Sequence, residues 1–110
     1  MLIVSHALSL KTEDKASIIA IRIYQPERSE TFWVCRYEID WPEGLRAFKS
    51  TGIDALQSLV LALQMIGAEI YSSAYHREGR LRAYDGEAGY GFPVANSLRD
   101  LLVGADKVAM

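Results

Sequence analysis

Residues 51–72, TGIDALQSLVLALQMIGAEIYS, constrain the fold most, because they form the one long segment of the chain with a clearly helical pattern. Apolar residues recur there at steps of three and four, which aligns them along one side of an α-helix that packs on a core. We expect Thr51 to cap this helix and Asp54 to return a hydrogen bond from its first turn. The apolar side consists of Leu56, Leu59, Val60, Leu63, Ile66, Gly67 and Ile70.

A second row of apolar residues, formed by Leu61, Met65 and Ala68, falls on roughly the opposite side of the predicted helix. A helix side that faces water should be polar at these positions. Either the C-terminal segment of the chain covers this row, or another protein chain does. The sequence leaves both alternatives open.

The part of the chain before the helix has the pattern of β-strands. Apolar residues alternate most clearly in residues 31–41, where one face carries Trp33, Cys35, Tyr37, Ile39 and Trp41. Short connections between consecutive strands favour an antiparallel meander, because parallel neighbours need long crossovers. We therefore predict an α+β fold in which an antiparallel meander of three to four strands packs on one long helix. The predicted strands are residues 2–10, 16–24, 31–41 and 45–50.

The pattern weakens after the helix. We expect residues 80–84 to form a short strand or an extended arm, and the glycine-rich residues 85–93 to form a loop. Asn96 or Ser97 is a candidate cap for a short last helix. The predicted fold therefore ends in a C-terminal extended arm followed by a short last helix.

Length and charge narrow the class of protein. A chain of 110 residues suits a single domain that spans residues 1–110. The formal net charge of −2 argues against nucleic-acid binding, which usually comes with a basic excess. The single cysteine excludes an internal disulfide bond and is typical of a reducing cytoplasm. Polar residues interrupt the apolar run of the predicted helix, which argues against a membrane span.

Candidate catalytic groups are few. His6 falls on the apolar side of the first predicted strand, and Cys35 falls on the apolar face of the third, so we expect both in the core. Neither His6 nor His76 has acidic or cysteine neighbours at the spacing of metal ligands. The glycines of residues 84–93 stand in the wrong order for a dinucleotide-binding loop. We therefore predict no catalytic residues, no metal site and no cofactor.

Two blocks of the sequence resemble a known family. The first runs from Gly52 to Leu59 as GIDALQSL, continues with Leu-Ala-Leu at residues 61–63 and ends with Ile-Gly-Ala at residues 66–68. The second is Gly-Phe-Pro at residues 91–93. The chain resembles, from residue 16 onward, a group of small, uncharacterised bacterial proteins classed only as a domain of unknown function. The resemblance implies a small bacterial cytoplasmic protein and supplies no catalytic residues.

These features favour a non-enzymatic protein-interaction module that acts as a homodimer. The row of Leu61, Met65 and Ala68 is the first candidate interface, because a two-fold pairing would bring the same row of both chains into contact. Tyr90 and Phe92 are further candidate interface residues, since rigid aromatic side chains provide contact area at low entropy cost. A narrower version is an immunity-type protein that neutralises a toxin, in which case another protein is the partner.

The alternative function is a small-ligand-binding protein or an enzyme with a pocket between the sheet and the C-terminal arm. The candidate pocket residues are His6, Arg82, Tyr84 and Tyr90. A concave site of about 300 Å³ or more with convergent polar groups would favour this alternative.

Overall fold

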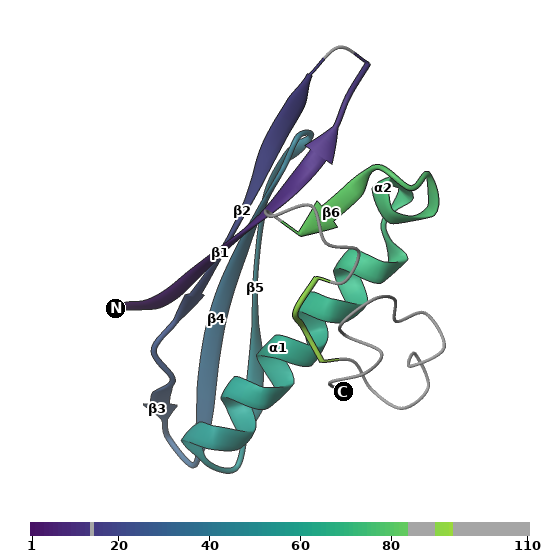
Figure 1. The fold of residues 1–110 in the computed structure, drawn as a ribbon. Helices are drawn as coiled ribbons and strands as arrows, with labels where there is room; N and C mark the ends of the chain where they lie inside the picture. Colours follow the sequence, from purple (N-terminus) through teal and green to yellow (C-terminus); the bar gives the residue numbers. More distant parts are fainter. Residues whose placement is uncertain (14, 84–89, 94–110) are drawn as a thin grey trace.

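An antiparallel sheet and one long helix form the fold in the computed structural model, which describes residues 1–13, 15–83 and 90–93 (Figure 1). The short helix α2 (Ala74–Arg77) follows the long helix α1 (Ala55–Ser72). The strands are β1 (Leu2–Lys11), β2 (Ala16–Tyr24), β3 (Glu27–Ser29), β4 (Phe32–Trp41), β5 (Gly44–Gly52) and β6 (Leu81–Ala83). The predicted α+β class, with strands packed against one long helix, is confirmed.

The four long strands of the sheet are neighbours in space in their order along the chain. β1 pairs with β2, β2 with β4, and β4 with β5, all antiparallel, so the predicted meander is confirmed. The short strand β3 also pairs with β4, and β6 returns after the helix to pair with β1. β6 corresponds to the strand or arm expected at residues 80–84. The short last helix expected from Asn96 or Ser97 lies outside the described residues.

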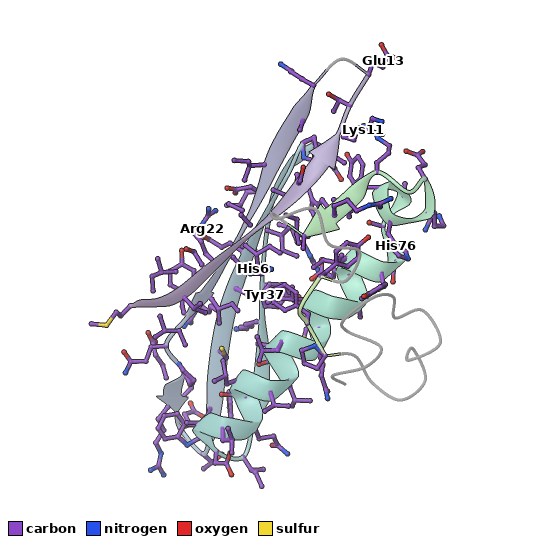
Figure 2. All side chains as sticks on the ribbon, viewed as in Figure 1. His6, Lys11, Glu13, Arg22, Tyr37 and His76 are labelled. Carbon is purple, nitrogen blue, oxygen red and sulfur yellow. The ribbon has the colours of Figure 1, made fainter. Side chains whose placement is uncertain are left out.

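The core lies between one face of the sheet and α1 (Figure 1). Alternation places Cys35, Tyr37 and Ile39 of β4 on this face, and all three are buried as predicted. Figure 2 shows Tyr37 on the helix side of the sheet and Arg22 on the other side. Among the described residues, no helix covers the other face, so its charged side chains remain partly exposed.

The helix begins later than the sequence predicts. Thr51 is not the N-cap, because β5 continues to Gly52 and keeps Thr51 paired with Val34 of β4. The N-cap is Asp54, whose Oδ1 accepts a hydrogen bond of 2.7 Å from the backbone N–H of Gln57. The side chain of Gln57 in turn accepts from the backbone of residue 53, so the two side chains satisfy N–H groups reciprocally at the helix start.

Two residues of the predicted apolar side of the helix, Leu56 and Val60, do not face the core, whereas Leu59 and Leu63 pack against it. Leu56 and Val60 are 70% and 39% exposed, whereas the buried residues are Ser58, Ala62, Ile66, Gly67, Ile70 and Tyr71. Small residues face the sheet here because α1 lies very close to the end of β5. A Cβ on Gly52 would lie only 2.6 Å from the backbone nitrogen of Ser58, so no larger residue fits between the strand and the helix.

Helix α1 is long and apolar enough to cross a membrane, by length and composition alone. The core helix of a soluble protein can have the same length and apolar composition. One third of the residues of α1 are buried, and they form the side of the helix that packs on the sheet. The globular arrangement with one weakly apolar helix suggests a soluble protein.

Candidate functional site

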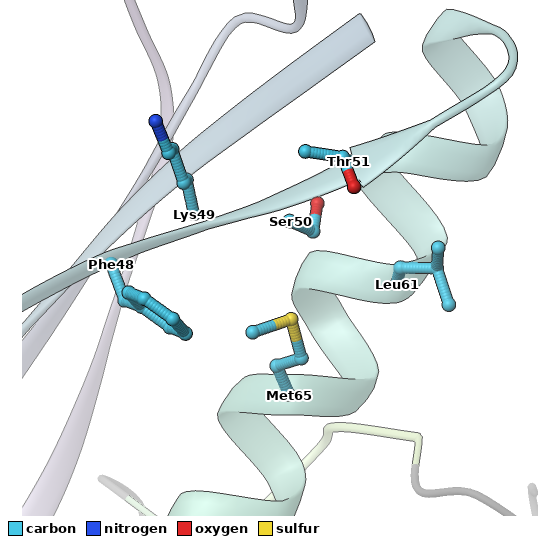
Figure 3. Close-up of a pocket in the computed structure, with 6 residues that line it drawn as sticks. All are labelled: Phe48, Lys49, Ser50, Thr51, Leu61 and Met65. Atoms are coloured by element: carbon cyan, nitrogen blue, oxygen red, sulfur yellow. The ribbon is translucent and has the colours of Figure 1, made fainter. Parts of the chain in front are cut away.

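A groove runs between β5 and α1 (Figure 3). Its volume is about 410 Å³, and we call it the β5 groove. Figure 3 shows the ring of Phe48 directed toward Met65 across the groove, while Lys49 points away from it. The lining residues are Phe48, Lys49, Ser50, Thr51, Leu61 and Met65.

Two polar contacts hold β5 against α1 at the two ends of the groove. At one end the hydroxyl of Ser50 donates a hydrogen bond to the carbonyl oxygen of Ser58. At the other end Arg46 Nε lies 3.0 Å from Glu69 Oε1. Between these contacts Phe48, Leu61 and Met65 provide an apolar lining, so β5 and α1 are fixed at both ends of a largely apolar hollow.

The groove opens beside a strand edge. β5 pairs with β4 along all nine of its residues, and no other described strand pairs with its second side, which we call the β5 edge. Alternate residues of an antiparallel strand direct their N–H and C=O groups away from the partner strand, so about four residues offer these groups at the edge. Leu45 and Phe48 of this strand are 57% and 47% exposed. A long edge with exposed apolar side chains is a template for pairing with another strand.

The structure brings only part of the predicted interface to this groove. Leu61 and Met65 line it, and both are half-buried beside β5 and not on the far side of the helix. Met65 also packs against the core cluster. Ala68 is half-buried but is not among the lining residues. Helix periodicity placed this row opposite the core because the small residues Ser58 and Ala62, which no apolar pattern marks, form the buried side of the first half of α1.

Sequence reasoning missed the contribution of β5. Phe48 and the β5 edge were not among the predicted site residues, although residues 45–50 were predicted as the last strand of the meander. The last strand of an open meander has no second neighbour unless another segment adds to it. An aromatic residue on such a strand was therefore a signal that could have identified the edge.

Tyr90 and Phe92, the other predicted interface residues, are buried in the chain's own core. The hydroxyl of Tyr90 lies 2.7 Å from Nδ1 of His76, and its ring packs against Tyr71. The ring of Phe92 meets His6 edge to face at a centroid distance of 5.2 Å. These contacts fix residues 90–93 to the domain, so their aromatic side chains are not displayed to a partner.

The predicted ligand pocket is assembled only in part. His6 and Tyr90 come together, but His6 Nε2 lies 3.0 Å from the backbone oxygen of Tyr90 and must donate to it. His6 is exposed on β1 and is therefore not the buried core residue that the sequence predicts, because α1 covers β4 and β5 and not this end of β1. Arg82 donates to backbone oxygens of its own turn. Tyr84 lies outside the described residues.

The stability of the contact between His76 and Tyr90 is expected to depend on pH. Burial lowers the pKa of His76 below its ordinary value of 6.5, so the folded chain favours the neutral imidazole, which is hydrogen-bonded to the hydroxyl of Tyr90. The unfolded chain then binds more protons below about pH 6.5, and the free energy of unfolding falls as the pH decreases through this range. Urea unfolding between about pH 7 and 5 should show this fall, and His76→Gln, which does not titrate, should reduce it. Equal slopes in both proteins would contradict this assignment.

The remaining polar groups offer little catalytic chemistry. Cys35 is buried, its thiol donates to the backbone oxygen of Tyr24, and burial raises its pKa, all of which describe a core residue and not a nucleophile. Within the described ranges, no group of three histidine, cysteine, aspartate or glutamate residues is arranged to hold a metal ion. A further hollow of about 430 Å³ at the β1–β2 turn is lined by Lys11, Thr12, Glu13 and Arg80. Arg80 is bound there to the backbone of Lys11 and to Glu78, and so is not a free anion ligand.

A family model described as a domain of unknown function, DUF6968, matches residues 4–94 of the chain. The resemblance expected from the two sequence blocks is therefore confirmed, and it extends further toward the N-terminus than residue 16. No curated protein and no solved structure matches the chain.

Proposed function

The chain belongs to the DUF6968 family, a domain of unknown function, and we propose that it is a non-enzymatic protein-interaction domain that self-associates through the β5 edge and the β5 groove. The observation that carries this proposal is the juxtaposition of a nine-residue strand edge, to which no described strand pairs, with a largely apolar groove beside it. Strand addition uses both features, since the edge supplies main-chain hydrogen bonds and the groove accepts side chains.

The lining of the groove favours a protein partner over a small ligand. Its volume of about 410 Å³ is large enough for a small molecule. Small-molecule sites also need polar groups that converge on the ligand. In the β5 groove the hydroxyl of Ser50 is bound to Ser58, and Lys49 points away from Met65 (Figure 3). Apart from the hydroxyl of Thr51, the rest of the lining comes from Phe48, Leu61 and Met65, whose side chains are apolar as in the centre of a protein interface.

We also propose a bacterial cytoplasmic location. The cytoplasmic location is supported by Cys35, the single cysteine of the chain, which is buried as a free thiol, and the bacterial origin is supported only by the family resemblance of the sequence.

Self-association should be lost when a charge enters the groove. Leu61→Glu is expected to weaken dimer formation by about tenfold or more, because the partner's apolar side chains would have to desolvate the carboxylate. Sedimentation at micromolar concentrations measures the dissociation constant of the wild-type chain and the variant. Leu61 is only half-buried, so the variant should keep its circular dichroism spectrum.

Ile18→Glu is the matched control for this test. Ile18 is 61% exposed on β2, and its backbone partner Ser9 belongs to β1, far along the sheet from β5. The same charge at this position should leave the dissociation constant unchanged. A wild-type chain that sediments as a monomer, or equal effects of the two substitutions, would refute the proposed function.

A further inference from the structure

We infer that two copies of the chain pair along β5 itself, antiparallel, about a two-fold axis at Phe48. The inference rests on the proposed self-association and adds the partner strand and its register. β5 has nine residues, from Gly44 to Gly52, and Phe48 is the middle one. An axis at Phe48 is therefore the one two-fold arrangement in which every residue of the strand has a partner. Any other axis along the strand leaves residues at both ends unpaired.

This register also separates the charges of the strand. Arg46 lies opposite the partner's Ser50, and Lys49 lies opposite the partner's Ala47, so no like charges face each other across the new pair. A two-fold axis at Arg46 or Lys49 would place each of these cations opposite its own copy, which is destabilising. Phe48 meets its own copy at the axis, and directly opposed aromatic residues stabilise antiparallel pairs.

The β5 grooves of the two copies meet beneath the paired strands. α1 packs against both β4 and β5, so two-fold pairing along β5 brings the two α1 helices side by side on the same face of the joined sheet. The half-buried Leu61 and Met65 of each copy then face those of the other, with Phe48 above them. The paired strands therefore bury Phe48, Leu61 and Met65 of both grooves.

Charge complementarity on the open face of the sheet supports the same register. Lys49 makes no ion pair among the described residues and lies beside Arg36 of β4. Glu38 and Asp40 share the single cation Arg22, at 2.8 and 2.7 Å, which leaves one net negative charge. Glu38 lies beside Ala47 on the next strand. In the paired sheet the side chain of Lys49 extends across the partner's small Ala47 toward the partner's Glu38, about two strand spacings away.

Cysteine cross-linking tests the register. Residues directly opposite each other in an antiparallel pair have Cα atoms about 4.5–5.5 Å apart, within the range that a disulfide bond spans. Under a mild oxidant, Phe48→Cys should form a covalent dimer, whereas the single variants Leu45→Cys and Thr51→Cys should not. The double variant Leu45→Cys/Thr51→Cys should cross-link, because these two positions face each other across the axis and Phe48 remains in place. Cys35 is buried, so the wild-type chain is the control for adventitious oxidation.

Each outcome separates this inference from the proposed function. Cross-linking of Leu45→Cys or Thr51→Cys alone, or of Ala47→Cys in preference to Phe48→Cys, would show a different register and overturn the inference. A dimer that depends on Leu61 but that neither Phe48→Cys nor the double variant captures would also overturn it, while the proposed function would stand. A monomeric wild-type chain would overturn both.

Discussion

Replacing Tyr37 with alanine is expected to lower the free energy of unfolding by about 3–5 kcal/mol, because it leaves a large cavity in the core. Tyr37 is 1% exposed at the centre of β4. Its ring meets Phe48 of β5 edge to face at 6.5 Å, and its hydroxyl donates to Glu69 of α1. Tyr37 thus connects the central strand, the edge strand and the helix. The free energy of unfolding of a small domain is only about 5–15 kcal/mol, so the expected loss is a large part of it.

Two other variants serve as comparisons. One tests the hydroxyl group of Tyr37 apart from its ring, and the other tests the loss of a different aromatic ring from the same strand. Tyr37→Phe keeps the ring and removes one hydrogen bond, while Glu69 keeps its ion pair with Arg46, so a loss of about 1 kcal/mol is expected. Phe32→Ala truncates an exposed aromatic residue on the same strand and should have a small effect. Urea unfolding, monitored by circular dichroism, measures the free energy of unfolding of Tyr37→Ala, Tyr37→Phe and Phe32→Ala. A loss in Tyr37→Ala no larger than in Phe32→Ala would contradict the central role of Tyr37.

Because of Tyr37, we also expect the free energy of unfolding to fall at alkaline pH. Burial, with the neighbouring carboxylate of Glu69, raises the pKa of Tyr37 above its ordinary value of 10.0. Above about pH 10 the tyrosine of the unfolded chain ionises and that of the folded chain does not, so the free energy of unfolding falls as the pH rises. The unfolding midpoint of Tyr37→Phe should decrease less over this range than that of the wild-type chain.

Replacing Arg22 with methionine is expected to lower the free energy of unfolding by about 2 kcal/mol at neutral pH, because two neighbouring carboxylates lose the cation between them. Arg22 Nε lies 2.8 Å from Glu38 Oε1, and the same guanidinium binds both oxygens of Asp40 at 2.7 and 2.8 Å. The hydroxyl of Tyr24 donates to Glu38 as well. The network joins β2 to β4 on the open face of the sheet, and its partial exposure keeps the expected loss below that of a buried pair.

The effect of Arg22→Met should shrink in acid. Hydrogen bonds from Arg22 lower the pKa of Glu38 below 4.5 and that of Asp40 below 3.8. Their contribution to stability is therefore present above these ordinary values and is lost as the pH falls through the lowered pKa values. The stability difference between the wild-type chain and Arg22→Met should narrow between about pH 5 and 3.

Arg36→Met is the control for this comparison. Its ion pair with Glu27, at 3.3 Å, joins two exposed side chains, so its removal should change stability by about 0.5 kcal/mol or less. A loss in Arg22→Met no larger than in Arg36→Met would show that the Arg22 network does not stabilise the fold.

The candidate site was predictable from the sequence only in its helical half. Leu61 and Met65 were identified because they are apolar, although they fall on the side of the helix that was predicted to face water and that is normally polar. Phe48 was not identified, because its role depends on which strand lies at the edge and how close the helix approaches it. Tyr90 and Phe92 had the composition of a displayed loop, yet their side chains are buried against His76, Tyr71 and His6.

Local patterns in the sequence by themselves determined that β1, β2, β4 and β5 are strands, that they form a meander, and that residues 55–70 are helical. The two-residue alternation of strands and the 3.6-residue periodicity of helices are properties of neighbouring residues, so both can be recognised without knowing how the rest of the chain folds. Only the tertiary structure decided which side of α1 meets the sheet, that Asp54 and not Thr51 caps it, and that the second side of β5 has no described partner. These features depend on contacts between residues far apart in the sequence, such as Gly52 against Ser58 and Arg46 against Glu69, which no local pattern encodes.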